Sequence, residues 1–190
     1  MKMKKDLGSI SAVCPMPILM VAAYGPDGKV DVMNAAMGMT CQKDKIALFI
    51  HESHKTTQNI LATKAFTVAL ADREHLAAAD YFGIVSGNKV PDKFERTGYH
   101  AVKSGHVNAP VIEEFPITME CELADVVSND SMYAIIGRIV NVCADESLIG
   151  ENGKVDISRT ELIAFDQFSS SYIVLGERAG MVALDGKSLK

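Results

Sequence analysis

The stretch that decides the fold class is Ile18-Leu-Met-Val-Ala-Ala-Tyr-Gly-Pro-Asp-Gly-Lys-Val-Asp-Val-Met-Asn34. Its apolar run, residues 18–24, predicts a buried strand, and the Gly-Pro-Asp-Gly cluster at 25–28 predicts a turn. From Val30 onward apolar and polar residues alternate, which is typical of a second strand with one buried face. The stretch therefore predicts a β-hairpin, and with it an antiparallel sheet.

Outward from this hairpin, further segments predict strands at residues 46–50, 66–70, 117–127, 132–144, 162–165 and 172–175. Short helices are predicted at 57–63 and at 73–82, the second after Asp72 as an N-cap residue. The strands do not alternate regularly with crossover helices, and no Gly-x-Gly-x-x-Gly is present, so a doubly wound parallel sheet is not expected. We expect a mainly β protein, a closed or half-closed β-barrel with inserted helices. Residues 83–110 read as a mostly irregular loop, and long loops in compact domains are usually functional or packed at an interface.

The composition is that of a folded protein with no nucleic-acid surface. Hydrophobic residues make up 48% of the 190 residues and charged residues 23%, and the net charge is −5. No repeat or linker divides the chain, so residues 1–190 are expected to form one domain. The apolar run at 18–24 is far shorter than the ~20 residues that span a bilayer, and Pro15 and Pro17 interrupt any signal-like helix. We expect a cytoplasmic protein that does not bind membranes.

The cysteines and histidines form no recognisable site. The four cysteines, at positions 14, 41, 121 and 143, show neither disulfide nor zinc spacing, and those at 121 and 143 are expected to be buried and reduced. The five histidines form no metal pair, and no Ser-His-Asp or Cys-His set emerges. No metal site and no catalytic side chain are therefore predicted, which fits a protein whose cofactor carries the reaction.

Three segments are candidates for binding such a cofactor. In the first, Lys55 and Thr56 precede an apolar helical stretch, and a helix N-terminus with a cation beside it binds phosphate well. Capping by Thr56 and a solvated Lys55 explain the same residues.

The second candidate segment is Met33–Cys41. Its small residues at 35, 36 and 38 leave room for a flat ligand, Asn34 and Thr40 offer hydrogen bonds, and the methionines at 37 and 39 suit contact with a ring. An ordinary core strand beside a bulge is the alternative.

In the third segment Ser86 and Gly87 form a turn that is followed by Lys93. The alternative there is a helix that ends at Gly83 and runs into an exposed loop.

Taken in order, these segments resemble the flavoredoxin branch of the flavin reductase-like, FMN-binding split-barrel family. The resemblance extends from about Pro15 to Gly186 and rests on Pro15-Met-Pro17, Asn34-Ala-Ala-Met-Gly38, His54-Lys-Thr56 with Asn59-Ile60, Asp80-Tyr-Phe-Gly-Ile-Val-Ser-Gly87 with Asp92-Lys-Phe94, Ala109-Pro110 with Glu120-Cys121, and Ala144-Asp-Glu146. It implies an FMN-binding split β-barrel and a homodimer with FMN near the subunit interface.

The resemblance also implies which residues hold the cofactor. They are Asn34, Ala35, Ala36, Met37, Gly38, Met39, Thr40 and Cys41 at the ring, His54, Lys55, Thr56 and Asn59 at the phosphate end, and Ser86, Gly87 and Lys93 from the following loop. Met37 stands where the family commonly has an aromatic residue, which predicts a softer contact with the ring.

The function that this resemblance implies is that of an FMN-dependent oxidoreductase. Electrons would pass from NADH, NADPH or a partner protein through FMN to an acceptor, while backbone N–H groups near residues 39–41 stabilise negative charge on the ring. The first alternative is an FMN-binding electron carrier that does not itself oxidise NAD(P)H. The second is a haem protein that uses His51 or His54 as a ligand.

Overall fold

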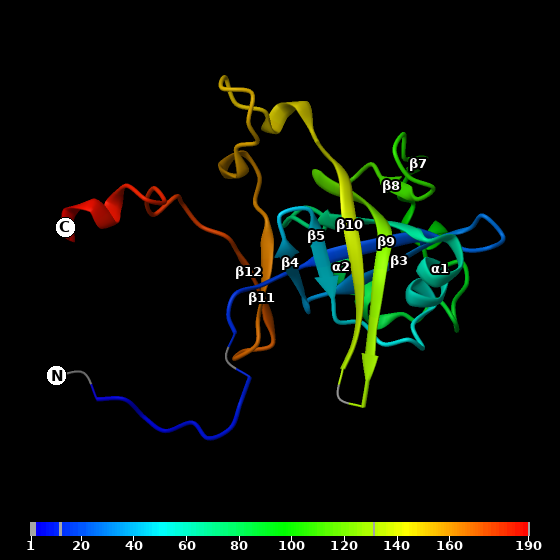
Figure 1. Ribbon diagram of the computed structural model, residues 1–190, viewed down its shortest axis with the longest axis horizontal. Coiled ribbons are helices and arrows are strands. Elements are labelled where there is room, and N and C mark those ends of the chain that lie inside the picture. Colours follow the sequence, from blue (N-terminus) through cyan, green and yellow to red (C-terminus); the bar gives the residue numbers. More distant parts are fainter. Residues whose placement is uncertain (1–2, 12, 131, 190) are drawn as a thin grey trace.

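The computed structural model describes residues 3–11, 13–130 and 132–189 (Figure 1). Its strands are β1 Met16–Pro17, β2 Leu19–Tyr24, β3 Val30–Ala35, β4 Gly38–Gln42, β5 Lys45–Leu48, β6 Ala65–Leu70, β7 Ala101–Lys103, β8 Pro110–Ile112, β9 Ile117–Asn129, β10 Met132–Ala144, β11 Ile163–Asp166 and β12 Ser171–Val174. Its α-helices are α1 Lys55–Thr63 and α2 Leu76–Ile84, and short 3₁₀ segments lie at Glu95–Thr97, Glu146–Leu148, Ile157–Arg159 and Asp185–Leu189.

Seven antiparallel strands form the main sheet, in the order β3-β2-β6-β9-β10-β5-β4. The two outermost strands, β3 and β4, are consecutive in the chain and are joined only by residues 36 and 37. The sheet therefore has to curl until its two edges meet. Gly38 marks the meeting point, because an added β carbon there would lie 2.6 Å from Leu19 Cδ1 of β2 and 2.8 Å from Leu48 Cδ2 of β5.

Strand β2 is buried on both faces, which explains why its sequence is a continuous apolar run. Alternate side chains point to opposite faces of a strand. Leu19, Val21 and Ala23 face the interior of the barrel with Phe66 and Ile135, whereas Met20 and Ala22 face an outer core. That outer core includes Phe82 of α2 and Ile163 of β11, so the helix and the small sheet cover the outside of the hairpin.

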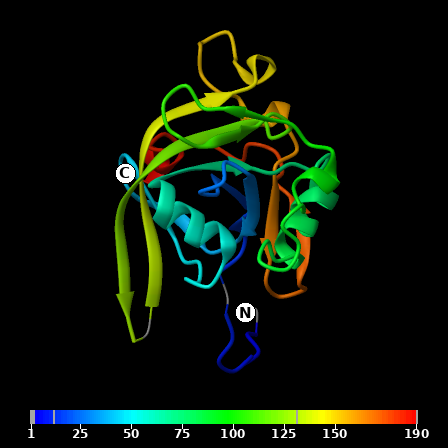
Figure 2. The ribbon, with the colours of Figure 1, turned by 90° about the vertical axis from the view of Figure 1, so that its right-hand side faces the viewer.

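The two helices lie on either side of the β2–β3 hairpin, as Figure 2 shows. Helix α1 packs on β2 and β3 and places the fully buried Ile60 in the barrel core. Helix α2 packs on β3 through Ala79 and Phe82. The N-terminus of α1 and the C-terminus of α2 therefore approach the same strand, and they enclose the candidate site.

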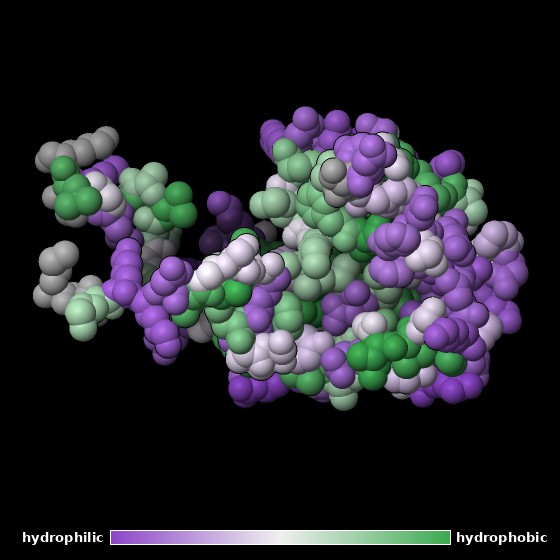
Figure 3. Space-filling view, turned by 90° about the horizontal axis from the view of Figure 1, so that it is seen from below, coloured by the Kyte–Doolittle hydropathy of each residue, from purple (hydrophilic) through white to green (hydrophobic). Residues whose placement is uncertain are grey.

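Two small sheets and two arms complete the molecule. β1, β11 and β12 form one sheet, and β7 and β8 form the other. The chain before β1 and the chain after β12 extend away from the barrel on the same side (Figures 1 and 3). They carry apolar side chains in the open, such as Val182 at 97% exposed and Leu189 at 91%. None of the helices in the described part of the chain is long and apolar enough to cross a membrane.

Most elements lie where the sequence predicts them, and the prediction of a mainly β barrel is confirmed. Helix α1 begins two residues before the predicted start, and α2 begins at Leu76 instead of residue 73. The second shift arises because Asp72 accepts a hydrogen bond from the backbone N–H of His75 (3.1 Å), which holds the residues between them in a turn. The region 83–110 is less irregular than expected, since it contains a 3₁₀ segment and β7 and ends where β8 begins.

Candidate functional site

A cavity of about 210 Å³ lies between the start of α1 and the loop that follows α2. Its wall consists of Met33, Asn34, His54, Lys55, Thr56, Phe82, Gly83, Ile84, Val85, Ser86, Gly87 and Lys93. The wall contains two lysines and a histidine and no carboxylate, while Asp31 lies outside it, 3.5 Å from Lys93 Nζ. The cavity is therefore suited to an anion.

The N-terminus of α1 supplies further anion-binding groups. His54 is the N-cap residue, but its side chain makes no capping hydrogen bond, and the first turn contains no acidic residue. The first N–H groups of a helix have no acceptor within the helix, and they carry a partial positive charge. The capping interpretation of Thr56 is therefore wrong: Thr56 lies inside the helix, and its hydroxyl donates to Asp31 Oδ2.

Lys93 is a buried cation that joins the loop after α2 to β3. Its side chain is only 3% exposed, and its Nζ donates to the carbonyl of Val85 (3.1 Å) and lies 3.5 Å from Asp31 Oδ1. Burial lowers the pKa of the Lys93 ammonium, and the Asp31 carboxylate opposes that shift. Because Asp31 also accepts from Thr56, one buried carboxylate holds together β3, α1 and the loop that carries Lys93.

Two glycines let the loop after α2 approach the strand and the helix closely. An added β carbon at Gly83 would lie 3.3 Å from Asn34 Cβ. At Gly87 it would collide with Asp31 Oδ1 and lie 3.2 Å from Lys55 Cβ. Asn34 is fixed by donating from Nδ2 to the carbonyl of Ala79 in α2 (3.0 Å). The cavity wall is therefore formed by backbone at these positions.

Asn59 faces a second cavity, of about 200 Å³, which shares Lys55 and Gly87 with the first. The residue is 1% exposed, and neither Nδ2 nor Oδ1 has a hydrogen-bond partner in the described residues. A buried amide without partners costs about 1–3 kcal/mol. The arrangement fits a ligand whose polar groups satisfy Asn59, and FMN, with its phosphate and ribityl hydroxyls, has such groups.

The surroundings of His54 favour the neutral form of its imidazole. Desolvation, then the nearby His51 and Lys93, lower the pKa of the His54 imidazole. A bound phosphate would act in the opposite direction, because a negative charge stabilises the imidazolium.

The residues predicted to contact the ring are divided between the cavity, the two cores and the sheet edge. Of residues 34–41, only Asn34 lies in the cavity wall. Ala35 is buried in the barrel core, Ala36 packs on the outer core, and Gly38 is half-buried. Met37, Met39, Thr40 and Cys41 are exposed on or beside β4, the last strand of its sheet. The alternative interpretation of this segment as a core strand is therefore wrong for positions 37 and 39–41.

Sequence reasoning missed Asp31 and the apolar part of the cavity wall. Asp31 is 6% exposed although it stands at the polar position of an alternating strand, between Val30 and Val32, so its burial could not be predicted from the pattern. Ile84 lies in the wall and is 75% exposed, but sequence alone does not distinguish an exposed isoleucine from a buried one.

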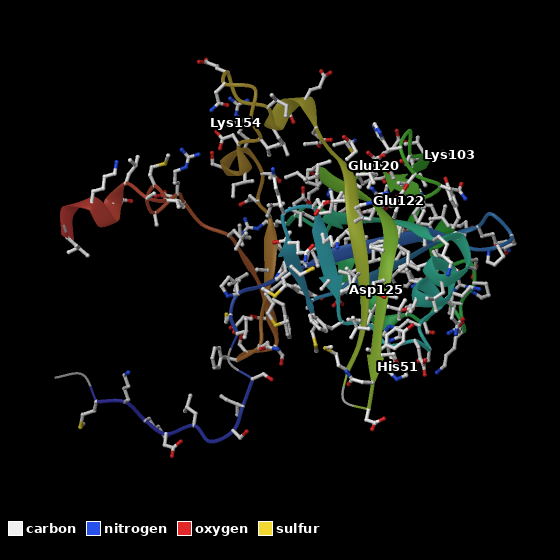
Figure 4. All side chains as sticks on the ribbon, in the orientation of Figure 1. His51, Lys103, Glu120, Glu122, Asp125 and Lys154 are labelled. Carbon is white, nitrogen blue, oxygen red and sulfur yellow. The ribbon has the colours of Figure 1, made fainter. Side chains whose placement is uncertain are left out.

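A second polar cluster lies around Glu120 of β9 (Figure 4), and none of its residues lines the cavity. The Glu120 carboxylate accepts from Ser104 Oγ (2.5 Å) and from Asn141, and His106 Nε2 lies 3.9 Å from it. Since Ser104 also accepts from the N–H groups of His106 and Val107, the cluster is satisfied internally and fixes the loop between β7 and β8.

The cysteines are unpaired, and no metal-binding group of His, Cys, Asp and Glu side chains is found among the described residues. Burial raises the pKa of the Cys121 thiol to about 12, so it is inert as a nucleophile. Cys143 is half-buried and donates to the carbonyl of Thr118 (3.6 Å).

Comparison with known proteins identifies the family of the chain. Residues 11–158 match the family model described as a flavin reductase like domain. The chain belongs to the flavin reductase-like family. The resemblance inferred from the sequence motifs is thereby confirmed.

Several solved structures share the fold. Flavoredoxin of Desulfovibrio vulgaris (Miyazaki F) is 32% identical with a TM-score of 0.91, over 97% of this chain and 100% of that one. Flavoredoxin from Methanosarcina acetivorans is 24% identical with a TM-score of 0.86, over the whole of both chains. The 2-nitrobenzoate 2-nitroreductase of Pseudomonas fluorescens is 20% identical with a TM-score of 0.78, over 90% of this chain and 86% of that one. The predicted split-barrel fold is confirmed by these likenesses.

Proposed function

We propose that the protein is an FMN-dependent oxidoreductase that passes electrons from a reduced nicotinamide or a partner protein to an acceptor. The observation that carries this proposal is the uncapped N-terminus of α1, with Lys55 beside it, in a cavity wall that contains no carboxylate. FMN, when bound, supplies the redox chemistry, accepting and releasing electrons at its ring system.

The phosphate end of FMN is assigned to the start of α1. Lys55 and the N–H groups of the first turn, which have no acceptor within the helix, would donate charge-assisted hydrogen bonds to the phosphate. Lys93 adds positive potential, although its hydrogen bond to Val85 and its pairing with Asp31 keep it in the wall. Ser86 and Gly87 bring a hydroxyl and closely approaching backbone to the same cavity. His54, Lys55 and Thr56 line this cavity together with Ser86, Gly87 and Lys93, whereas Asn59 lines the adjoining one.

The ring is assigned to the segment from Asn34 to Cys41, where β3 passes into β4. Ala35 and Ala36 pack into the two cores, so the surface assigned to the ring runs from Asn34 to the exposed residues of β4. Because β4 is the last strand of its sheet, every second residue has backbone groups without a partner in the sheet. Those N–H groups can stabilise negative charge at the ring edge without a titrating side chain.

A second copy of the chain is proposed to complete the ring site. Met37 is 59% exposed and Met39 is 64% exposed, and an apolar partner surface would cover both. The proposed homodimer would thus shield a ring bound against β4 from water.

An electron carrier without its own NAD(P)H oxidation is the second candidate. It is favoured by the 32% identity to a protein called flavoredoxin, over nearly the whole of both chains. It shares the proposed FMN site and differs only in how the flavin is reduced.

The experiment that tests both candidates is the visible absorption spectrum of the purified protein, followed by addition of NADH or NADPH without oxygen. Flavin bands that survive gel filtration and then bleach rapidly would support the oxidoreductase. Bands that persist would favour the carrier. A colourless protein that does not take up added FMN would contradict both.

A further inference from the structure

The arm that follows β12 contains an ordered turn, residues 180–185, which we call the C-terminal turn. The Asp185 carboxylate accepts from the Met181 N–H (2.7 Å), and the Leu184 N–H donates to the Met181 carbonyl (3.2 Å). Ala183 has a φ of +62°, in the left-handed region that is unfavourable for a residue with a β carbon. An added β carbon at Gly180 would collide with the Asp185 carboxylate. The chain therefore holds a specific conformation here.

The C-terminal turn presents apolar side chains to water. Met181 is 53% exposed, Val182 97% and Leu184 51%, and none of them belongs to a hydrophobic cluster of the described residues. Apolar side chains gathered in the open mark an interaction site on a soluble protein. The order of this turn therefore indicates that another surface packs on it.

The base of the arm is fixed and directs the C-terminal turn away from its own barrel. The Leu175 N–H donates to the Leu162 carbonyl (2.9 Å), and Arg178 Nη2 lies 3.7 Å from Asp156 Oδ1. Beyond this base the arm extends outward from the molecule (Figures 1 and 3). The surface that receives the turn is therefore expected on another molecule.

A matching apolar surface lies on the outside of β4, β5 and β10. In the register of these strands Ala47 of β5 is paired with Met39 of β4 and with Ile136 of β10. Because successive side chains of β5 point to opposite faces, and its other side chains are in the barrel core, these three face outward. The Phe49 N–H donates to the Met37 carbonyl (2.8 Å), and both side chains are exposed. We call these five residues the β4 apolar face.

The position of the β4 apolar face favours a second copy of the chain as its partner. Helices α1 and α2 pack on β2 and β3 instead. Strand β4 lies on the side of the barrel from which the two arms leave (Figure 1). A two-fold axis on that side would bring the C-terminal turn of each copy to the β4 apolar face of the other, since contacts across such an axis are reciprocal.

We propose that the C-terminal turn of one copy packs on the β4 apolar face of a second copy and closes the ring site there. The proposal deepens the proposed function and rests on it, because Met37 and Met39 of this face are assigned to the flavin ring. It names the segment of the partner copy that excludes water from that ring.

The test uses full-length variants with opposite charges and measures their mass by light scattering at several concentrations. Met39→Glu and Val182→Lys each place a charge in the apolar contact, so each alone should shift the mass from twice the chain mass towards the chain mass. In a mixture of the two, one contact pairs the introduced carboxylate with the introduced ammonium, and the other contact is wild type. We expect the mixture to recover twice the chain mass.

The control is Val13→Lys, at a position of the N-terminal arm that is 70% exposed. It should remain dimeric, and mixing it with Met39→Glu should not restore the dimer mass of that variant. In the dissociated variants the FMN affinity should fall about tenfold, the effect of uncovering about 55 Å² of apolar surface.

Three outcomes would overturn the proposal. Val182→Lys could remain dimeric, or the mixture could remain monomeric. A single chain with both substitutions could also recover the wild-type mass when the mixture does not, which would mean that the C-terminal turn folds onto its own barrel. FMN binding by the wild type is measured separately, so a dimer that follows these expectations but binds no flavin would refute the proposed function alone.

Discussion

At the scale of single residues, the site contains buried polar side chains, and such burial costs folding free energy unless the groups have hydrogen-bond or ion-pair partners. Asp31 and Lys93 are compensated by each other and by Thr56, which explains how β3, α1 and the following loop keep their spacing. Asn59 is uncompensated within the described residues. The contacts among Asp31, Lys93 and Thr56 fix the shape of the cavity, whereas the Asn59 amide is left for hydrogen bonds to the proposed ligand.

Replacing Asn59 by leucine is expected to separate stability from binding. The variant removes an unsatisfied buried amide, whose cost is about 1–3 kcal/mol, so the ligand-free protein should unfold at the same urea concentration or a higher one. The increase in melting temperature produced by added FMN should become smaller. A variant that is clearly less stable without ligand would show instead that Asn59 has a structural partner.

His54 gives the ligand-free protein a defined pH dependence. Its folded-state pKa is lowered below the ordinary value of 6.5, so the unfolded chain binds more protons in the window below that value. The contribution of His54 to stability is therefore present above about pH 6.5 and is lost as the pH falls through the folded pKa. Urea unfolding at about pH 7 and about pH 5.5 should show a smaller loss in His54→Gln than in the wild type. Equal losses would contradict the assignment.

At the scale of secondary-structure elements, the small C-terminal sheet fixes the helix that forms one side of the cavity. The Tyr172 hydroxyl of β12 donates to Asp80 Oδ1 of α2 (2.8 Å). Burial, then the Asp80 carboxylate, raises the pKa of the Tyr172 phenol to about 12, so it remains a donor at any physiological pH. Through α2 this contact supports the carbonyl of Ala79, to which Asn34 is bound.

Removing that hydroxyl should weaken the anchoring of α2. Tyr172→Phe leaves a partly buried Asp80 carboxylate without its donor, and we expect a loss of about 1–3 kcal/mol in the free energy of unfolding. Tyr133→Phe is the matched control, a half-buried tyrosine of β10. Urea denaturation measures both, and equal losses in the two variants would refute a special role for the Tyr172–Asp80 contact.

Which elements can be predicted from the sequence depends on their length. Long strands such as β9 and β10 are predictable because apolar and polar residues alternate along them, and β10 has the predicted bounds. Strands of three residues such as β7 and β8 have no periodicity to detect. At the site, Lys55 and Thr56 were recognisable as lying next to a helix start, which the structure places two residues earlier than predicted. The pairing of Asp31 with Lys93, in contrast, depends on packing between distant segments.

At the scale of the whole molecule, the exposed apolar side chains are a surface for the proposed association with a second copy of the chain. Met37 and Met39 lie at the edge of the barrel, and the two terminal arms extend from it with apolar side chains in the open (Figure 3). Burial of apolar surface contributes about 25 cal/mol per Å². Association with a second copy would give these groups a common partner.

A charge on the β4 edge should therefore disrupt the proposed dimer. We expect the wild type to elute with light scattering at twice the chain mass, and Met39→Glu to shift towards the monomer because the carboxylate cannot be buried without a partner. Val102→Glu, at an exposed position of β7, serves as the control and should remain dimeric. A wild type that is monomeric at all concentrations would rule out the homodimer.

The central claim is that the start of α1 binds the phosphate of a flavin, and the most direct test compares FMN with riboflavin, which lacks only that phosphate. Quenching of flavin fluorescence during titration with the protein gives both affinities. Since hydrogen bonds to charged groups contribute about 1.5–3 kcal/mol each, FMN should bind at least about tenfold more tightly than riboflavin, and Lys55→Met should reduce the difference. Equal affinities for the two flavins, unchanged by Lys55→Met, would contradict the account.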